Sequence, residues 1–95
     1  MQSFLDCLPA VLKSVASRPE VALLLIRELW PQIVGPGLAR NVEPVQLEGH
    51  RLVLQVGDPV WKAQVEELRS LIMSAINDRW GCRLVERIEV GFRPK

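Results

Sequence analysis

The first half of the chain carries its hydrophobic residues at the spacing of helices. A first apolar stripe runs through Leu8, Val11, Leu12 and Val15. The stretch VALLLIRELW, residues 21–30, is apolar around most of a helical circumference. We therefore expect two helices, and the second, which starts at about Pro19, should be the central buried helix.

Local signals indicate where this second helix begins and ends. Ser17 and Glu20 have the spacing of a capping box, in which each side chain accepts from the backbone N–H of the other residue. Pro31 removes one internal hydrogen bond, and residues 35–37, Gly-Pro-Gly, cannot continue a regular helix. The sequence thus predicts a kink near Pro31 and an end near Gly35, with one extra turn over residues 38–40.

The second half changes to the two-residue period of strands. The alternating apolar residues are Val45 and Leu47, then Leu52, Leu54 and Val56. Gly49 lies in the short turn between the two groups and can adopt positive φ, so the pattern predicts a β-hairpin. Residues 83–93 predict a further strand, with a bulge or an exposed strand end at Glu86. Its predicted inward side consists of Leu84, Ile88, Val90 and Phe92.

One long helix is predicted between the hairpin and the last strand. Asp58 and Pro59 suit its N-cap and first turn, and Gly81 suits its C-terminal stop. Its apolar stripe consists of Trp61, Val65, Leu68, Ile72 and Ile76.

The predicted order of helix, helix, strand, strand, helix, strand makes residues 1–95 one α+β domain. We expect a three-stranded sheet with the helices on one face and a solvated second face. If the last two strands pair in parallel, their crossover should be right-handed. The residues predicted on the solvated face are Arg51, Val53, Gln55, Arg83, Val85, Arg87, Glu89 and Arg93. The predicted core is Leu24, Leu25, Leu29, Trp30, Leu47, Leu52, Leu54, Val56, Trp61, Val65, Leu68, Ile72, Ile76, Ile88 and Val90.

Composition narrows the class of protein. The hydrophobic fraction of 48% allows a core that offsets the ordering entropy of the chain. The longest apolar run, residues 21–26, is far short of the roughly 20 residues that span a bilayer, and the N-terminus lacks the basic start of a secretory signal. Cys7 and Cys82 stand far apart, which argues against a disulfide framework and favours buried thiols in a reduced, cytoplasmic compartment.

The charge is balanced overall but uneven along the chain. The formal net charge is +1, yet residues 79–95 carry five basic side chains against two acidic ones. Such a basic segment suggests an anionic partner, although a solvated charged face has the same composition.

The residues that carry chemistry do not converge in the sequence. His50 is the one histidine, it falls on the hairpin turn, and no phosphate-binding loop or nucleophile motif is present. Pro36 removes an N–H that a phosphate cradle at residues 35–37 would use. Asp58 beside Lys62 is explained by helix capping. We expect a binding protein that is not an enzyme and uses no cofactor, metal or small-molecule substrate.

Tryptophan is the other notable residue type. Trp30 and Trp61 occupy predicted core positions. Trp80 stands beside the stop glycine, where it is harder to bury, so it either covers the edge of the core or contacts a protein partner.

Two blocks anchored by tryptophan resemble the DciA family. The matching positions are Leu8, Pro9, Val11 and Leu12, then Trp30, Ile33, Val34, Gly35, Leu38, Ala39 and Pro44, then Leu52, Leu54, Val56, Trp61, Leu68, Leu71, Ile72, Ile76, Gly81 and residues 85–92. The resemblance implies a KH-like fold and a role in bacterial DNA replication. Family members help to load or operate the replicative helicase, bind single-stranded and tailed DNA, and have no ATPase of their own.

The chain departs from the KH pattern in one respect. KH domains grip nucleic acid with a G-x-x-G loop between two helices, and the glycines at 35 and 37 have the wrong spacing and precede the strands. Any nucleic-acid contact must therefore use another surface. Many family members also carry a basic, flexible extension, and DNA affinity that depends on one would be lost in a chain that stops at Lys95. No motif maps the residues that contact the helicase.

The basic part of the predicted solvated face is our candidate nucleic-acid site. Its residues are Arg51, Arg83, Arg87, Arg93 and Lys95. Arginine suits phosphate because its planar fork bonds two oxygens at once. With Phe92 expected to point inward, no aromatic ring would stack on bases, so binding should be weak and independent of sequence. The alternative is that these arginines pair across the sheet with Glu48, Glu86 and Glu89.

Three functions follow from these patterns. The leading hypothesis is a non-enzymatic accessory protein that binds the replicative helicase and assists its loading on single-stranded DNA. The second is a KH-like RNA-binding module, such as one associated with ribosomes. The third is a structural or dimerising protein that uses Trp80 and the apolar helix.

Overall fold

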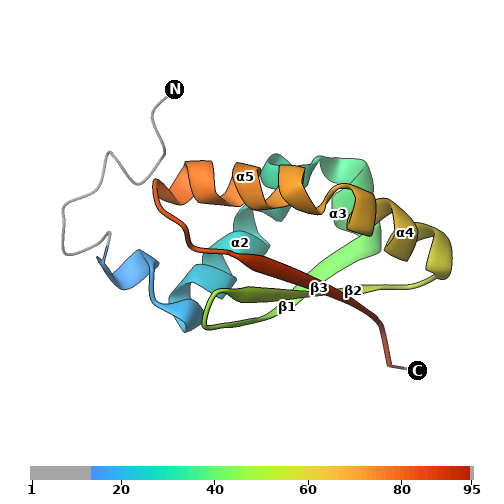
Figure 1. Ribbon diagram of the computed structural model, residues 1–95, viewed down its shortest axis with the longest axis horizontal. Coiled ribbons are helices and arrows are strands. Elements are labelled where there is room, and N and C mark those ends of the chain that lie inside the picture. The colour runs from blue at the N-terminus through green and yellow to red at the C-terminus, as the bar shows by residue number, and fades with distance from the viewer. Residues whose placement is uncertain (1–13, 95) are drawn as a thin grey trace.

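A computed structural model describes residues 14–94 of the chain (Figure 1). Its elements are α2 (Pro19–Val34), α3 (Pro36–Asn41), β1 (Val42–Glu48), β2 (Arg51–Val56), α4 (Pro59–Glu67), α5 (Arg69–Trp80) and β3 (Arg87–Phe92). Residues 14–16 are helical, and the rest of the first predicted helix lies outside the described residues. The predicted α+β class is confirmed.

The strands form one sheet in the order β1-β2-β3. β1 and β2 make the predicted hairpin, with Gly49 at a φ of 61°, and β3 pairs in parallel with β2. Figure 1 shows the helices gathered on one side of the sheet. Every second residue of β2, from Leu52 to Val56, is fully buried against them. The residues between them lie on the side of the sheet that the helices leave open, which we call the open face.

The long helix α2 buries one stripe and exposes the opposite side. Ala22, Ile26 and Trp30, spaced four residues apart, are buried, whereas Leu24 is 63% exposed. The prediction that Leu24 belongs to the core is therefore wrong, because a helix lying on one face of a sheet contacts it along a single stripe. Pro31 lies inside the helix, which ends before Gly35 as predicted.

The predicted capping box at the start of α2 is not formed. Arg18 is the N-cap residue, and no side-chain hydrogen bond caps the helix there. Pro19 follows at the first helical position, where its missing N–H removes one of the donors that a cap would otherwise satisfy.

A β-bulge in β1 shifts its alternation. The strand begins at Val42, earlier than predicted, and the register with β2 slips between Pro44 and Gln46. Val45 is the extra residue, so the buried positions are Val42, Pro44 and Leu47. The predicted pairing of Val45 with Leu47 on one side is therefore wrong.

The predicted long helix is two helices. The chain breaks at Leu68, whose backbone has a φ of −95° and a ψ of 5°, and no proline or glycine marks the position. The Leu68 N–H donates to Gln64 O and Val65 O at 3.1 and 3.0 Å, while its own carbonyl accepts from the Ile72 N–H at 2.9 Å. Leu68 thus closes α4 and opens α5 without a side-chain cap.

Both predicted ends of this helical segment are confirmed. The Asp58 carboxylate accepts a hydrogen bond from the Trp61 N–H at 3.0 Å, which caps α4. Gly81 ends α5 in the left-handed conformation, with a φ of 67°, and its N–H donates to Asn77 O at 2.8 Å.

The last strand begins four residues later than predicted, at Arg87. In the connection before β3, the Asn77 side chain of α5 makes two hydrogen bonds of 2.9 Å with the Val85 backbone. Asn77 Nδ2 donates to the Val85 carbonyl, and Asn77 Oδ1 accepts from the Val85 N–H. This connection buries Val85 and Leu84 to 1% and 6% exposure, so the prediction of Val85 on the solvated face is wrong. Glu86 is the exposed residue just before the strand.

Most of the predicted core is confirmed. Trp30, Leu47, Leu52, Leu54, Val56, Val65, Ile72, Ile76 and Ile88 are buried, and Leu25, Leu29, Trp61, Leu68 and Val90 pack partly buried against them. The predicted core list omitted Ala16, Ala22, Ile26, Val42, Trp80 and Val85, and also Leu84, which the strand pattern had placed on the inward side.

Truncation within α5 should separate core positions from surface positions. Ile76 is fully buried, so Ile76→Ala should lower the free energy of unfolding by about 2–5 kcal/mol. Leu71 on the same helix is 68% exposed, and Leu71→Ala should change it by less than about 0.5 kcal/mol. Urea unfolding followed by tryptophan fluorescence measures both. Equal losses in the two variants would contradict the placement of α5.

Candidate nucleic-acid interface

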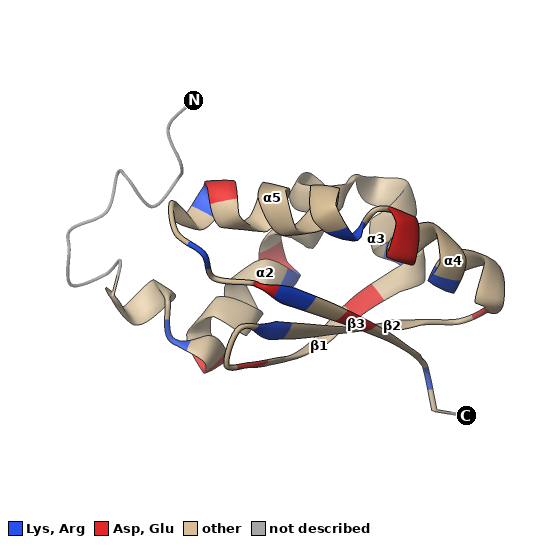
Figure 2. Cartoon of the chain, viewed as in Figure 1, with Lys and Arg blue, Asp and Glu red and all other residues tan. Residues whose placement is uncertain are grey.

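The open face brings charged residues of all three strands into rows. The pairing register places Arg51 between Glu48 and Arg87, and Val53 between Gln46 and Glu89. A third row runs from Glu43 through Gln55 to Gly91. Figure 2 shows basic and acidic segments side by side along the sheet. The face therefore carries carboxylates on β1 and β3 as well as the arginines that the sequence pointed to.

Arg51 is engaged by acidic neighbours. Its guanidinium lies 2.9 Å from a Glu89 carboxylate oxygen and 3.8 Å from one of Glu48. The alternative of cross-strand pairing therefore holds for Arg51, and two carboxylates offset its positive charge. Its share in any phosphate binding is correspondingly reduced.

The other predicted site residues lie along the outer strand. Arg87 opens β3 and Arg93 follows its last residue, and both are exposed with no ion pair to residues 14–94. Arg83 is exposed in the connection before β3, so it lies beside the sheet and not on its face. Lys95 lies outside the described residues. The structure thus separates Arg51 from a row of arginines on the edge strand.

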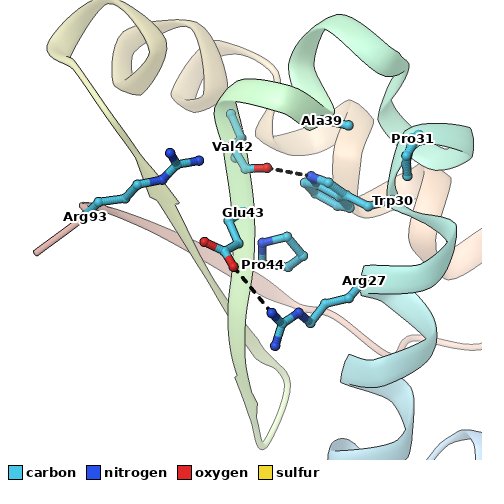
Figure 3. A pocket seen from close by; sticks show the side chains of 8 residues that line it. All are labelled: Arg27, Trp30, Pro31, Ala39, Val42, Glu43, Pro44 and Arg93. Atoms are coloured by element: carbon cyan, nitrogen blue, oxygen red, sulfur yellow. Dashed lines mark hydrogen bonds and ion pairs between the residues drawn. The ribbon is translucent and has the colours of Figure 1, made fainter.

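A pocket of about 330 Å³ extends the open face toward α2 (Figure 3). Arg27 of α2 forms an ion pair with Glu43 at 3.3 Å, and the Trp30 Nε1–H donates to Val42 O at 2.8 Å. Arg93 reaches the same pocket from the far side of the sheet. Glu43 is already paired with Arg27, so Arg93 is the guanidinium that remains available to an anion. Sequence reasoning missed Arg27 and Glu43, because only the packing of α2 against β1 brings them together.

The opposite end of the face carries charges of both signs. A hollow of about 600 Å³ at the hairpin turn is lined by Glu48, Gly49, His50, Arg51, Glu86, Arg87 and Glu89, in which acidic residues outnumber arginines. The His50 carbonyl there accepts from the N–H groups of Glu86 and Arg87, which fixes the start of β3. Within residues 14–94, no group of His, Cys, Asp or Glu could hold a metal ion.

Comparison with known families places the chain. The family described as Dna[CI] antecedent, DciA, matches residues 3–90. The chain belongs to the DciA family. The match covers nearly the whole sequence and confirms the resemblance carried by the tryptophan-anchored blocks. Membership points to a role in replicative helicase loading during DNA replication. No curated protein matches the chain.

Trp80 of this DciA-family chain is part of the core. The side chain is 4% exposed, and its Nε1–H donates to Ala16 O at 2.9 Å. Almost none of the Trp80 side chain is therefore accessible to the protein partner that the sequence suggested. Ala16 and Trp80 are 64 residues apart in the sequence, so the sequence pattern does not reveal this contact.

Two further expectations change on the structure. Phe92, expected to point inward, is 49% exposed, and the Lys62 ammonium lies 5.2 Å from its ring centroid. Cys82 is an exposed free thiol and not a buried one, while Cys7 lies outside the described residues. Among the described helices, none is long and apolar enough to cross a membrane.

An apolar hollow lies among the helices, away from the open face. It encloses about 190 Å³ and is lined by Ile33, Val34, Leu38, Leu68, Leu71, Ile72 and Ala75. The end of α2, α3 and the first half of α5 meet there, and Leu68 at the junction of α4 and α5 also lines the hollow. Leu71 at its rim is 68% exposed.

A double-mutant cycle should measure the pairing of Arg51 with Glu89. Both side chains are partly exposed, at 37% and 50%, so the coupling should be about 0.2–1 kcal/mol. Urea unfolding of wild type, Arg51→Ala, Glu89→Ala and the double variant gives this value. It should shrink in about 1 M salt because the pair is screened.

The matched control for this cycle is Glu86, which is exposed and makes no ion pair with residues 14–94. A cycle of Arg51 with Glu86 should give no coupling. Equal coupling in the two cycles would mean that Arg51 responds only to the overall charge of the face.

Proposed function

We propose that this protein is a non-enzymatic accessory factor that binds the replicative helicase and assists its loading on single-stranded DNA. The observation that carries this proposal is the family match over residues 3–90, which includes every described element up to β3. The function belongs to the bacterial cytoplasm, where the chromosome is replicated, and the KH-like fold that the family resemblance implies is part of the same proposal.

The edge arginines support contact with nucleic acid. Arg83, Arg87 and Arg93 are exposed along one side of the molecule, and of these Arg87 and Arg93 lie at the two ends of β3. Guanidinium groups bind phosphate oxygens in pairs, and such contacts do not depend on base sequence. Because acidic residues on the open face offset part of this charge, the binding should be weak.

The apolar hollow supports contact with a protein. An exposed leucine beside a concave, aliphatic surface is typical of a position that a partner buries on binding. We propose that the replicative helicase covers Leu71 and the hollow lined by Leu38 and Ala75. The arginines and the hollow occupy different sides of the fold, so helicase and DNA can be held at the same time.

Substitution of the exposed leucine tests the helicase contact. Leu71→Asp places a charge in a surface that the helicase should desolvate, so helicase binding should fall at least about tenfold, as at an interface hot spot. Biolayer interferometry with purified replicative helicase measures the affinity.

The control for this test is Leu24→Asp, since Leu24 is 63% exposed on α2 outside the hollow. Its helicase affinity should equal that of wild type. If wild type captures no helicase, or captures only a second copy of itself, the proposed function is wrong. If both variants bind normally, only the assigned surface is wrong.

Charge reversal tests the nucleic-acid contact. Arg83→Glu with Arg87→Glu should weaken binding of single-stranded DNA at low salt, because two phosphate contacts become repulsive. If wild type engages three or four phosphates, its log–log salt slope should be about −2 to −3, and the double variant should show a shallower slope. Fluorescence anisotropy of a labelled oligonucleotide measures both.

Arg40→Glu with Arg69→Glu is the charge-matched control, since both arginines are exposed on the helical layer. Its affinity should fall much less. Equal losses in the two double variants would show that only net charge matters. Clear preference for RNA over DNA of the same sequence would favour the alternative of an RNA-binding module.

A further inference from the structure

We propose that Phe92, with Lys62 beside its ring, is a base-stacking site for single-stranded nucleic acid at the end of β3. The inference rests on the proposed function, since it assumes that single-stranded DNA binds along this edge. Phe92 lies beyond residues 3–90, which the family match covers, so membership of the family does not assign this role.

The ring is exposed while its backbone is held. Phe92 is 49% exposed, although it pairs with Val56 in the sheet. The next N–H, that of Arg93, donates to Val56 O at 2.9 Å and closes the ladder. A ring on the end of a paired strand is positioned before a ligand arrives, so binding need not order the backbone. An exposed aromatic ring of this kind is a surface on which a base can stack.

A cation lies against the ring. The Lys62 ammonium is 5.2 Å from the ring centroid, within the range of a cation–π contact. Lys62 belongs to the first turn of α4, whose N-cap Asp58 already accepts a hydrogen bond from the Trp61 N–H. The ammonium therefore lies over one face of the ring. A base would stack on the opposite face, and its flanking phosphate would approach the ammonium past the ring edge. An aromatic platform beside a positive charge matches a nucleotide better than it matches an aliphatic protein side chain.

The position of β3 lets one strand of nucleic acid reach both kinds of contact. Side chains alternate along a strand, so Phe92 points to the helical side while Arg87 and Arg93 point to the open face. β3 is an edge strand, with β2 on one side only. An extended single strand that follows this edge can place phosphates on the arginines and one base on Phe92.

Oligonucleotides with and without bases test this site. Labelled oligothymidine and an abasic strand of equal length are titrated with wild type and Phe92→Leu at low salt, by fluorescence anisotropy. Phe92→Leu keeps an apolar side chain but removes the π face, so it should weaken binding of oligothymidine about five- to tenfold. Its affinity for the abasic strand should be unchanged, and Phe92→Trp should restore the affinity for oligothymidine.

Controls separate this inference from the proposed function. Val60→Ala, at a position 75% exposed on α4, should bind both strands as wild type does. Equal loss on the two strands, or no loss on either, in Phe92→Leu would overturn the stacking site while leaving DNA binding intact. A Phe92→Leu variant that lost only helicase affinity would assign the ring to the protein partner and also overturn it. If wild type binds neither strand, the DNA-binding part of the proposed function fails, and this inference fails with it.

Discussion

The pairing of β2 on both of its sides is the constraint on which the rest of the structure depends. β2 is antiparallel to β1 and parallel to β3, and its residues Leu52, Leu54 and Val56 are fully buried under the helices. A shift of one residue in either register would turn these side chains to solvent. The burial of β2 therefore fixes which residues of β1 and β3 share the open face, and so the charge of that face.

The register explains why the candidate site moved to the edge of the sheet. Arg51 is on the central strand, which has a neighbouring strand on each side. Its guanidinium lies near Glu48 of β1 and Glu89 of β3. Arg87 and Arg93 belong to an edge strand with a neighbour on one side only. Neither Arg87 nor Arg93 makes an ion pair with residues 14–94, so the positive charge without a paired carboxylate lies at the two ends of β3.

Local signals in the sequence were enough for much of the fold. The hairpin around Gly49, the cap at Asp58 and the stop at Gly81 each depend on residues that are neighbours in the chain, so their chemistry can be read without the tertiary structure. The alternation of β2 gave the buried side of the central strand for the same reason. The predicted alternation placed Arg87 and Arg93 on the open face, although it expected Arg87 in the middle of the strand and not at its start.

Features that depend on contacts between distant elements could not be predicted. The bulge at Val45 is defined by the pairing of β1 with β2. The buried Trp80 indole donates a hydrogen bond to Ala16, which is distant in the sequence. Alternation assigned Phe92 to the core, but a strand end receives core packing only if a helix covers it. The pairing of Arg51 likewise needed the register, since Glu89 is far from it in the sequence. The surroundings of Phe92 and Arg51 in the candidate site therefore could be known only from the folded structure.

The parallel pairing of β3 also has a consequence during synthesis of the chain. β1 and β2 are joined by a short turn and can pair as soon as they leave the ribosome, but β3 follows α4 and α5. Until β3 is synthesised, the second edge of β2 has unpaired N–H and C=O groups beside an apolar face that α4 and α5 do not yet cover. The nascent hairpin can take up a strand from another chain during this interval, so a delay in completing α5 would favour misassembly.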